Sequence, residues 1–214
     1  FPRCYPAEIS TRKLFMSLIV LSAGGTGGHV FPAMALAREL TARGHDLRLL
    51  TDARGLKYAT EFDPDGIEVI AAGGLVSGAL HKRAGGLLRL ARGYFQARGH
   101  LARWKPNAVV GFGGFPSAPP MLAAQHMRIP TLMHEQNGVM GRANEFVSRG
   151  AEQISAAFPS VEGVPAAAHT KLRVVGNPIR ADIAAVGEAP FPAVESNINV
   201  VVFGGSQGAA VFSR

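Results

Sequence analysis

Three glycine-rich segments are the part of the sequence best suited to chemistry. They cover residues 24–29, 111–117 and 204–208. Each follows a short apolar run that predicts a strand, and glycine lets the backbone approach a ligand closely and adopt positive φ. A helix that begins behind such a loop presents free N–H groups and a partial positive charge to a phosphate. Together the three loops predict a protein that binds a phosphate-bearing ligand.

Two common phosphate-binding motifs do not fit these loops. The dinucleotide fingerprint G-x-G-x-x-G requires glycine at position 30, which is Val30, although Asp52 ends a predicted strand where a ribose-binding acid is expected. In addition, no glycine run continues into the Gly-Lys-Ser/Thr of a P-loop. The sequence therefore disfavours a dehydrogenase and a P-loop enzyme.

Polar residues accompany the glycine loops. His29 ends the first loop at a predicted helix amino terminus, where a histidine either caps and packs the helix or acts as a general base. The cluster at residues 134–137, His-Glu-Gln-Asn, directly follows an apolar strand. It forms either a hydrogen-bond network at the strand end or part of a site. Both interpretations remain open for each feature.

A possible metal site is weaker. Asp63 and Asp65 resemble the Asp-x-Asp metal site of some glycosyltransferases, but Pro64 and Gly66 predict a turn before the next strand. We expect no metal and no cofactor.

The elements that position these residues alternate along the chain. Apolar runs predict strands at residues 18–21, 47–51, 67–72, 108–112, 130–134, 154–158 and 172–175. Helices are predicted at residues 32–43, with Pro32 in the first turn and Gly44 as the stop, and at residues 79–104. This alternation predicts an α/β fold with a Rossmann-like parallel sheet. Ligands of such sheets lie at the carboxyl ends of the strands, where the glycine loops are.

The chain divides into four segments. Residues 1–15 precede the first strand and are expected to be an extension outside the fold. Residues 16–185 form the predicted domain, and residues 186–197 resemble a linker rich in Pro, Gly, Ser and Glu. Residues 198–214 contain one apolar run and the third glycine loop, which is the expected start of a second domain.

Composition favours a folded cytoplasmic protein. Hydrophobic residues make up 47% of the chain and charged residues 17%. The single cysteine, Cys4, excludes an intrachain disulfide, and no apolar run reaches the length of a membrane span. The sequence lacks a recognition motif for nucleic acid, so no nucleic-acid partner is expected.

The net charge of +7 is concentrated in one region. No acidic residue lies between Glu68 and Glu135, whereas that interval contains eight lysines and arginines. Within it, residues 75–105 mix cations with Leu, Phe and Trp side chains. Such a mixture is typical of a surface that binds an anionic membrane, or of an amphipathic helix that packs on the core.

The ordered motifs resemble those of the MurG family of bacterial peptidoglycan glycosyltransferases. The matching segments are residues 24–32 (GGTGGHVFP), 113–117 (GGFPS), 134–138 (HEQNG), 175–180 (VGNPIR) and 204–209 (GGSQGA). The resemblance implies the amino-terminal, acceptor-binding domain of a two-domain GT-B glycosyltransferase. It also implies inverting transfer of N-acetylglucosamine from UDP-N-acetylglucosamine to lipid I, which gives lipid II, at the cytoplasmic face of the inner membrane.

The resemblance also implies roles for individual residues. His29 corresponds to the base that removes the acceptor proton. The donor contacts it implies are Thr26, Gly27, Gly28, Asn137, Arg180 and Ser206. The candidates for the acceptor diphosphate are Gly113, Gly114, Ser117 and Glu135.

The sequence departs from the family at Phe115, where tyrosine is common. Because the sequence continues only to Arg214, shortly after Ser206, we expect this chain to fold its first domain and to catalyse little transfer alone. The alternative to an enzyme is a module that binds anionic lipid or nucleic acid through its basic face. The three glycine loops and the polar cluster argue against it, because an electrostatic binder needs neither.

Overall fold

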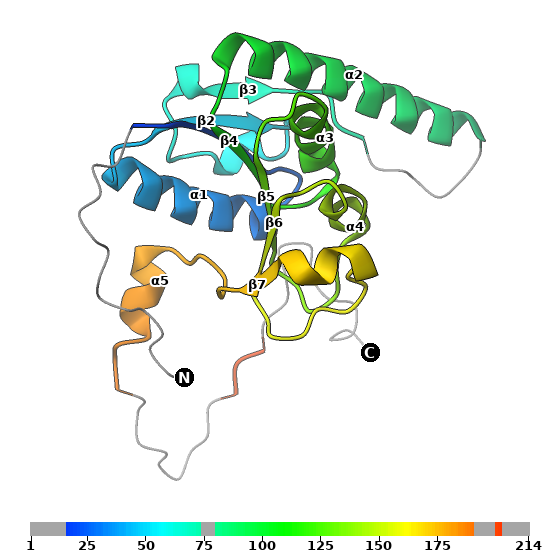
Figure 1. Cartoon of the computed structure of the whole chain (residues 1–214). Helices are drawn as coiled ribbons and strands as arrows, with labels where there is room; N and C mark the ends of the chain where they lie inside the picture. The colour runs from blue at the N-terminus through cyan, green and yellow to red at the C-terminus, as the bar shows by residue number, and fades with distance from the viewer. Residues whose placement is uncertain (1–15, 74–79, 191–199, 203–214) are drawn as a thin grey trace.

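The computed structural model describes residues 16–73, 80–190 and 200–202, without the side chains of residues 80–83. In this part of the chain seven strands form one parallel sheet, in the order β3-β2-β1-β4-β5-β6-β7 (Figure 1). The strands are β1 (Leu18–Ser22), β2 (Asp46–Thr51), β3 (Ile67–Val69), β4 (Ala108–Gly111), β5 (Thr131–Glu135), β6 (Gln153–Ala156) and β7 (Leu172–Val174). The predicted Rossmann-like α/β fold is confirmed, and every predicted strand up to residue 175 is present.

Helices cover both faces of the sheet. They are α1 (Gly27–Ala42), α2 (Leu80–Trp104), α3 (Ala118–His126), α4 (Arg142–Ser148) and α5 (Ala181–Val186). Figure 1 shows α1 on one face of the sheet and α2 and α3 on the other, with α5 next to α1. This arrangement is a doubly wound sheet.

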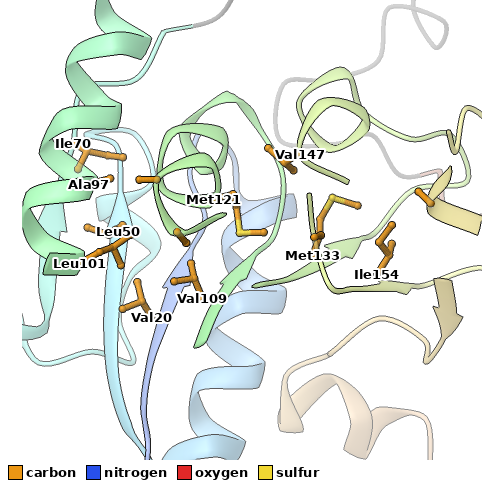
Figure 2. Packing of buried hydrophobic residues seen from close by; sticks show 14 of the residues in the cluster. Val20, Leu50, Ile70, Ala97, Leu101, Val109, Met121, Met133, Val147 and Ile154 are labelled. Carbon is orange, nitrogen blue, oxygen red and sulfur yellow. The ribbon is translucent and has the colours of Figure 1, made fainter. Parts of the chain in front are cut away.

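Alternating strand residues divide the core into two clusters. Val20, Leu50 and Val109 pack with Ala97 and Leu101 of α2, together with α3, on one face (Figure 2). Their neighbours in the chain are directed to the opposite face, where they pack against α1; these are Leu21, Leu49 and Val110. Because successive side chains of a strand point to opposite faces, each central strand contributes to both clusters and is apolar throughout.

The strand order reverses between β1 and β4. From β1 the chain proceeds to β2 and β3 on one side, and it then returns to β4 and builds the other side. In open α/β sheets the ligand crevice lies outside the carboxyl ends of the strands at such a reversal. The loops that meet there contain residues 23–26 and 112–117.

The start of α1 was predicted wrongly. The helix begins at Gly27, because the N–H groups of His29 and Val30 both donate to the carbonyl of Thr26 and so close a first turn. Pro32 lies inside the helix, beyond its first turn. His29 therefore belongs to the first turn itself. The predicted stop is correct, since Gly44 adopts a φ of 82° after the last turn.

The proposed domain boundaries lie largely outside the described residues. Residues 1–15, 191–199 and 203–214 are not described, so the extension and the third glycine loop with Ser206 stay predictions. Helix α5 ends at the start of the predicted linker, and residues 200–202 belong to no strand. In the described part of the chain, no helix combines the length and the apolar composition needed to cross a membrane.

Candidate functional site

Asp52 fixes the first glycine loop. Its carboxylate is 6% exposed at the end of β2, and Oδ1 accepts the N–H groups of Gly25 at 2.8 Å and Gly55 at 3.0 Å. The other oxygen accepts Nε of Arg54 at 2.8 Å. Asp52 stands where a dehydrogenase would have a ribose-binding acid, but here it holds the first glycine loop in place. A Cβ on Gly24 would lie 2.7 Å from Oδ1 of Asp52, so this approach requires glycine.

His29 lies beside the second glycine loop. Its Nδ1 is 3.0 Å from the carbonyl oxygen of Phe112 and 3.4 Å from Oε1 of Gln136. Both partners are oxygens that only accept, so Nδ1 carries the hydrogen. In the neutral imidazole the lone pair then belongs to Nε2, which can accept a proton. The structure gives His29 the tautomer that a general base requires.

The second glycine loop brings its backbone close to His29. Gly113 and Gly114 adopt φ values of 81° and 74°, which favour glycine. A Cβ on Gly114 would lie 3.1 Å from Cδ2 of His29 and 3.2 Å from the carbonyl oxygen of Gly24. Ser117 is buried, and its hydroxyl donates to the carbonyl of Gly114 at 3.1 Å. This geometry gives the Ser117 hydroxyl a role in holding the turn.

Glu135 is a buried carboxylate that receives four hydrogen bonds. Oε1 accepts the backbone N–H and the side-chain amide of Asn137, at 3.0 and 2.9 Å. Oε2 accepts the N–H of Gly141 at 3.1 Å and the amide of Asn144 at 2.7 Å. Because both oxygens are occupied and the residue is 1% exposed, the geometry favours positioning of the loop between β5 and α4 over direct contact with a diphosphate.

His134 lies beneath the site rather than in it. It is 2% exposed, with Nδ1 2.9 Å from Oγ of Ser155 and Nε2 3.2 Å from Oδ1 of Asn177. Burial lowers the pKa of His134 below its ordinary value, although the contact with Asn177 and the charge of Glu135 oppose this shift. His134 thus connects strands β5 and β6 to the segment that follows β7.

Two cavities adjoin the amino terminus of α1. The first, of about 340 Å³, contains His29, Gly114, Glu135 and Asn137 among its lining residues. The second, of about 250 Å³, is lined by Gly27 and Gly28 together with the segment 177–180. The structure therefore separates the predicted residues into a cavity around the base and a cavity next to Arg180.

Two predicted donor residues contact neighbouring side chains. Arg180 is the residue directly before α5, and its side chain makes no capping hydrogen bond. Its guanidinium lies 5.2 Å from the ring centroid of Phe31 and 3.5 Å from Asp182. Asn137 is exposed, but its amide already donates to Glu135. Thr26 is the residue before α1, and its side chain makes no capping hydrogen bond.

Two site residues were not assigned a role from the sequence. Gln136 donates Nε2 to the Phe112 carbonyl at 2.9 Å and reaches the ring of His29, so it helps orient the imidazole. Asn144, 2% exposed, lines the cavity around His29, and its buried Oδ1 lacks a hydrogen-bond partner in the described part of the chain. Gln136 belongs to the cluster 134–137, whereas Asn144 carried no signal beyond its position three residues after Gly141.

An apolar groove of about 400 Å³ adjoins the cavity around His29. Its walls come from α2, α3 and α4, and it shares Phe115, Arg142 and Ala143 with that cavity. Large apolar side chains are exposed around it; they are Leu87, Leu88, Phe95 and Phe146. Part of the predicted surface at residues 75–105 is thus an exposed apolar face, while Leu101 is fully buried in the core.

Metal ligands are not grouped within the described residues, where no set of three or more His, Cys, Asp or Glu side chains could hold an ion. Residues 64–66 form a short 3-10 helix directly before β3, as the turn prediction for Asp63 and Asp65 requires.

The doubly wound sheet and the glycine loops at its reversal point define a Rossmann-like domain of the glycosyltransferase class. Residues 19–156 match the Glycosyltransferase family 28 N-terminal domain, and the chain belongs to this family.

Curated relatives agree with this assignment. The chain is 49% identical over 203 residues to the UDP-N-acetylglucosamine--N-acetylmuramyl-(pentapeptide) pyrophosphoryl-undecaprenol N-acetylglucosamine transferase of Methylorubrum populi. That alignment covers 94% of this chain and 55% of the relative. The chain spans about half the length of the curated relatives it matches.

Solved structures agree with the fold. The crystal structure of Acinetobacter baumannii MurG matches with a TM-score of 0.61 and 29% identity, over 82% of this chain and 50% of that one. The UDP-GlcNAc 2-epimerase of Methanocaldococcus jannaschii matches with a TM-score of 0.52 at 15% identity, over 76% of this chain and 46% of that chain, which shows a shared fold alone. The predicted resemblance to MurG is confirmed.

Proposed function

We propose that this chain provides the acceptor-binding domain and the general base of a glycosyltransferase that transfers N-acetylglucosamine from UDP-N-acetylglucosamine to lipid I. The observation that carries the proposal is the hydrogen bond from Nδ1 of His29 to the Phe112 carbonyl. This bond leaves Nε2 as the proton acceptor of a side chain that lines a cavity together with Gly114 and Gly141. The names of the relatives supply the donor and the acceptor.

In the proposed reaction, Nε2 of His29 removes the proton of the acceptor hydroxyl as its oxygen attacks the anomeric carbon of the donor sugar. A carbon–oxygen bond forms, and the bond to the diphosphate breaks on the opposite side, so that UDP leaves with the electron pair. The configuration inverts in this single displacement, and no covalent enzyme intermediate is needed.

The remaining predicted residues have supporting roles. Backbone N–H groups at Gly113 and Gly114 bind the acceptor diphosphate, while Glu135 and Ser117 hold the surrounding loops. In the second cavity Gly27, Gly28 and Arg180 face the donor, with Thr26 directly before them in the chain, and Arg180 stabilises the charge of the leaving diphosphate. Asn137 and Ser206 stay proposed donor contacts.

We further propose that the exposed apolar face around Leu87, Leu88 and Phe95 binds the cytoplasmic surface of the bacterial inner membrane. Exposed arginines lie on the same helix, at positions 89, 92, 98 and 103. Apolar side chains that insert between headgroups, surrounded by cations that attract anionic lipid, form a peripheral membrane surface. The adjoining groove brings that surface next to the cavity around His29, where a lipid-linked acceptor has to arrive.

A transfer assay tests the proposed reaction. It uses labelled UDP-N-acetylglucosamine and a lipid I analogue, with this chain and with a form extended by a second domain to the length of the relatives. We expect the extended protein to form product and His29→Ala to lower kcat by about 10²–10⁴-fold, the usual contribution of a general base. His45→Ala is the matched control, because His45 follows the opposite end of α1.

The outcomes separate the two parts of the proposal. An extended, folded protein that forms no product contradicts the glycosyltransferase assignment. Full activity in His29→Ala contradicts the role of the base but leaves the assignment intact.

A further inference from the structure

Arg54 is an exposed cation held in place by a buried anion. Asp52 is 6% exposed, and Arg54 is the partner of its Oδ2. The side chain of Arg54 is itself 64% exposed. An exposed arginine normally samples many rotamers, whereas a hydrogen bond from Nε to a buried carboxylate restricts this one. The guanidinium is therefore pre-positioned at the carboxyl edge of the sheet.

The two terminal nitrogens of this guanidinium remain available. The ion pair uses Nε, and within the described residues no other partner of Arg54 is present. A guanidinium has five N–H donors, so four are left after the contact with Asp52. This differs from the bidentate pairing in which an arginine uses two donors to neutralise a carboxylate.

One of the free nitrogens, Nη2, lies next to the first glycine loop. A Cβ built on Gly25 would lie 3.7 Å from Nη2 of Arg54, and Gly25 has a φ of 81°. A Cβ on Gly55 would lie 2.9 Å from Cα of Gly24, so the loop after β2 packs directly on the loop after β1. Asp52 connects the two loops, because its Oδ1 accepts N–H groups from both.

We propose that Arg54 is a further substrate-binding residue, whose terminal guanidinium nitrogens bind a diphosphate oxygen at the first glycine loop. Asp52 is the positioning residue that sets the guanidinium against Gly25. The inference rests on the proposed function, because the donor and the lipid-linked acceptor each carry a diphosphate. The other phosphate contacts proposed for the two glycine loops in the described residues are backbone N–H groups. Arg54 adds a side-chain cation to them.

The alternative is that Arg54 only neutralises Asp52. Kinetics of the extended protein distinguish the two. Loss of a charge-assisted hydrogen bond predicts that Arg54→Gln raises the KM of one substrate about tenfold or more. Arg54→Lys keeps the charge but loses the planar fork, so it should restore only part of the affinity. The matched control is Arg43→Gln, which removes an exposed, ion-paired arginine at the other end of α1.

The source of the diphosphate follows from which KM changes. A rise for the lipid I analogue assigns Arg54 to the acceptor, and a rise for UDP-N-acetylglucosamine assigns it to the donor. Unchanged KM values for both, with only a lower Tm, overturn the proposal in favour of simple neutralisation.

A binding measurement separates this inference from the proposed function. Inorganic pyrophosphate is titrated into the 214-residue chain and its Arg54→Gln and Arg43→Gln variants. Weaker binding in Arg54→Gln alone supports the anion site even if the extended protein transfers no sugar. Equal binding by all three proteins, or no binding to the parent chain, contradicts it.

Discussion

At the scale of single residues, buried polar side chains hold the loops of this site in place. Asp52, Glu135 and His134 are each buried, and each contacts a loop at the carboxyl edge of the sheet. Glu135 is stabilised by four N–H donors, and none of these partners within the described residues is a cation. A buried carboxylate with all its acceptor positions used is costly to disturb, so it fixes loop geometry with little freedom.

His134 makes stability depend on pH. Because burial lowers its pKa, the unfolded chain, with an ordinary histidine pKa of about 6.5, binds a proton more readily than the folded chain does. The free energy of unfolding should therefore fall as the pH drops below about 6.5, and it should level off below the pKa of the folded state. Urea unfolding at pH 7.5 and pH 5.5 measures the difference.

Two histidine variants serve as controls for this prediction. His134→Gln removes the titrating group and should flatten the pH dependence, whereas His169→Gln, at an exposed position, should leave it unchanged. If His134→Gln and the parent chain lose the same stability between the two pH values, the neutral state of His134 does not contribute.

At the scale of elements, two glycines of α2 separate the effect of side-chain packing on stability from the effect of helix propensity. A Cβ on Gly93 would overlap the backbone carbonyl oxygen of Ala71, whereas a Cβ on Gly99 would meet nothing within 4 Å. Gly93→Ala should destabilise the fold by about 1–3 kcal/mol through overpacking. Gly99→Ala should stabilise it by about 0.5–1 kcal/mol, because alanine is the better helix former.

Chemical denaturation of the two variants tests this pair. A stabilising effect of Gly93→Ala would show that α2 does not approach the segment after β3 as closely as the structure describes. A destabilising effect of Gly99→Ala would contradict the expected gain in helix propensity.

The elements were largely predictable because each strand is a short apolar run bounded by polar or glycine residues. Leu18–Ser22 and Asp46–Thr51 differ from their predicted bounds by one residue at one end. The start of α1 was not predictable from the preference of proline for first turns, since the N–H groups of His29 and Val30 already close a turn on the Thr26 carbonyl before Pro32. Local propensity places an element well, but the residue at which its first turn begins is less predictable.

The site was predictable as a location and less so as a set of contacts. The glycine loops and the cluster 134–137 were placed at the carboxyl edge because parallel strands share it. The roles of Gln136 and Asp52 depend on partners 24 and 27 residues away, Phe112 and Gly25. A single sequence contains no signal for such pairings, so Asp52 was considered only as a ribose-binding acid.

At the scale of the whole molecule, helix α2 lies across the fold from α5 (Figure 1). Leu88 and Phe95 are 73% and 69% exposed, and burying such a side chain contributes about 1.5–3 kcal/mol. Val186 on α5 is 70% exposed but lacks the surrounding arginines of α2. The two faces therefore offer similar apolar exposure in different electrostatic surroundings.

This contrast predicts how the chain binds vesicles that contain phosphatidylglycerol. Leu88→Ser and Phe95→Ser should each weaken binding about tenfold or more, whereas Val186→Ser should leave it unchanged. Added salt should weaken binding of the parent chain only in part, since screening removes the attraction of the arginines but not the insertion of apolar side chains. Co-sedimentation at low and high salt measures both effects. Binding that all three variants retain, and that high salt abolishes, would mean that charge alone brings the chain to the membrane and that the apolar face has another use.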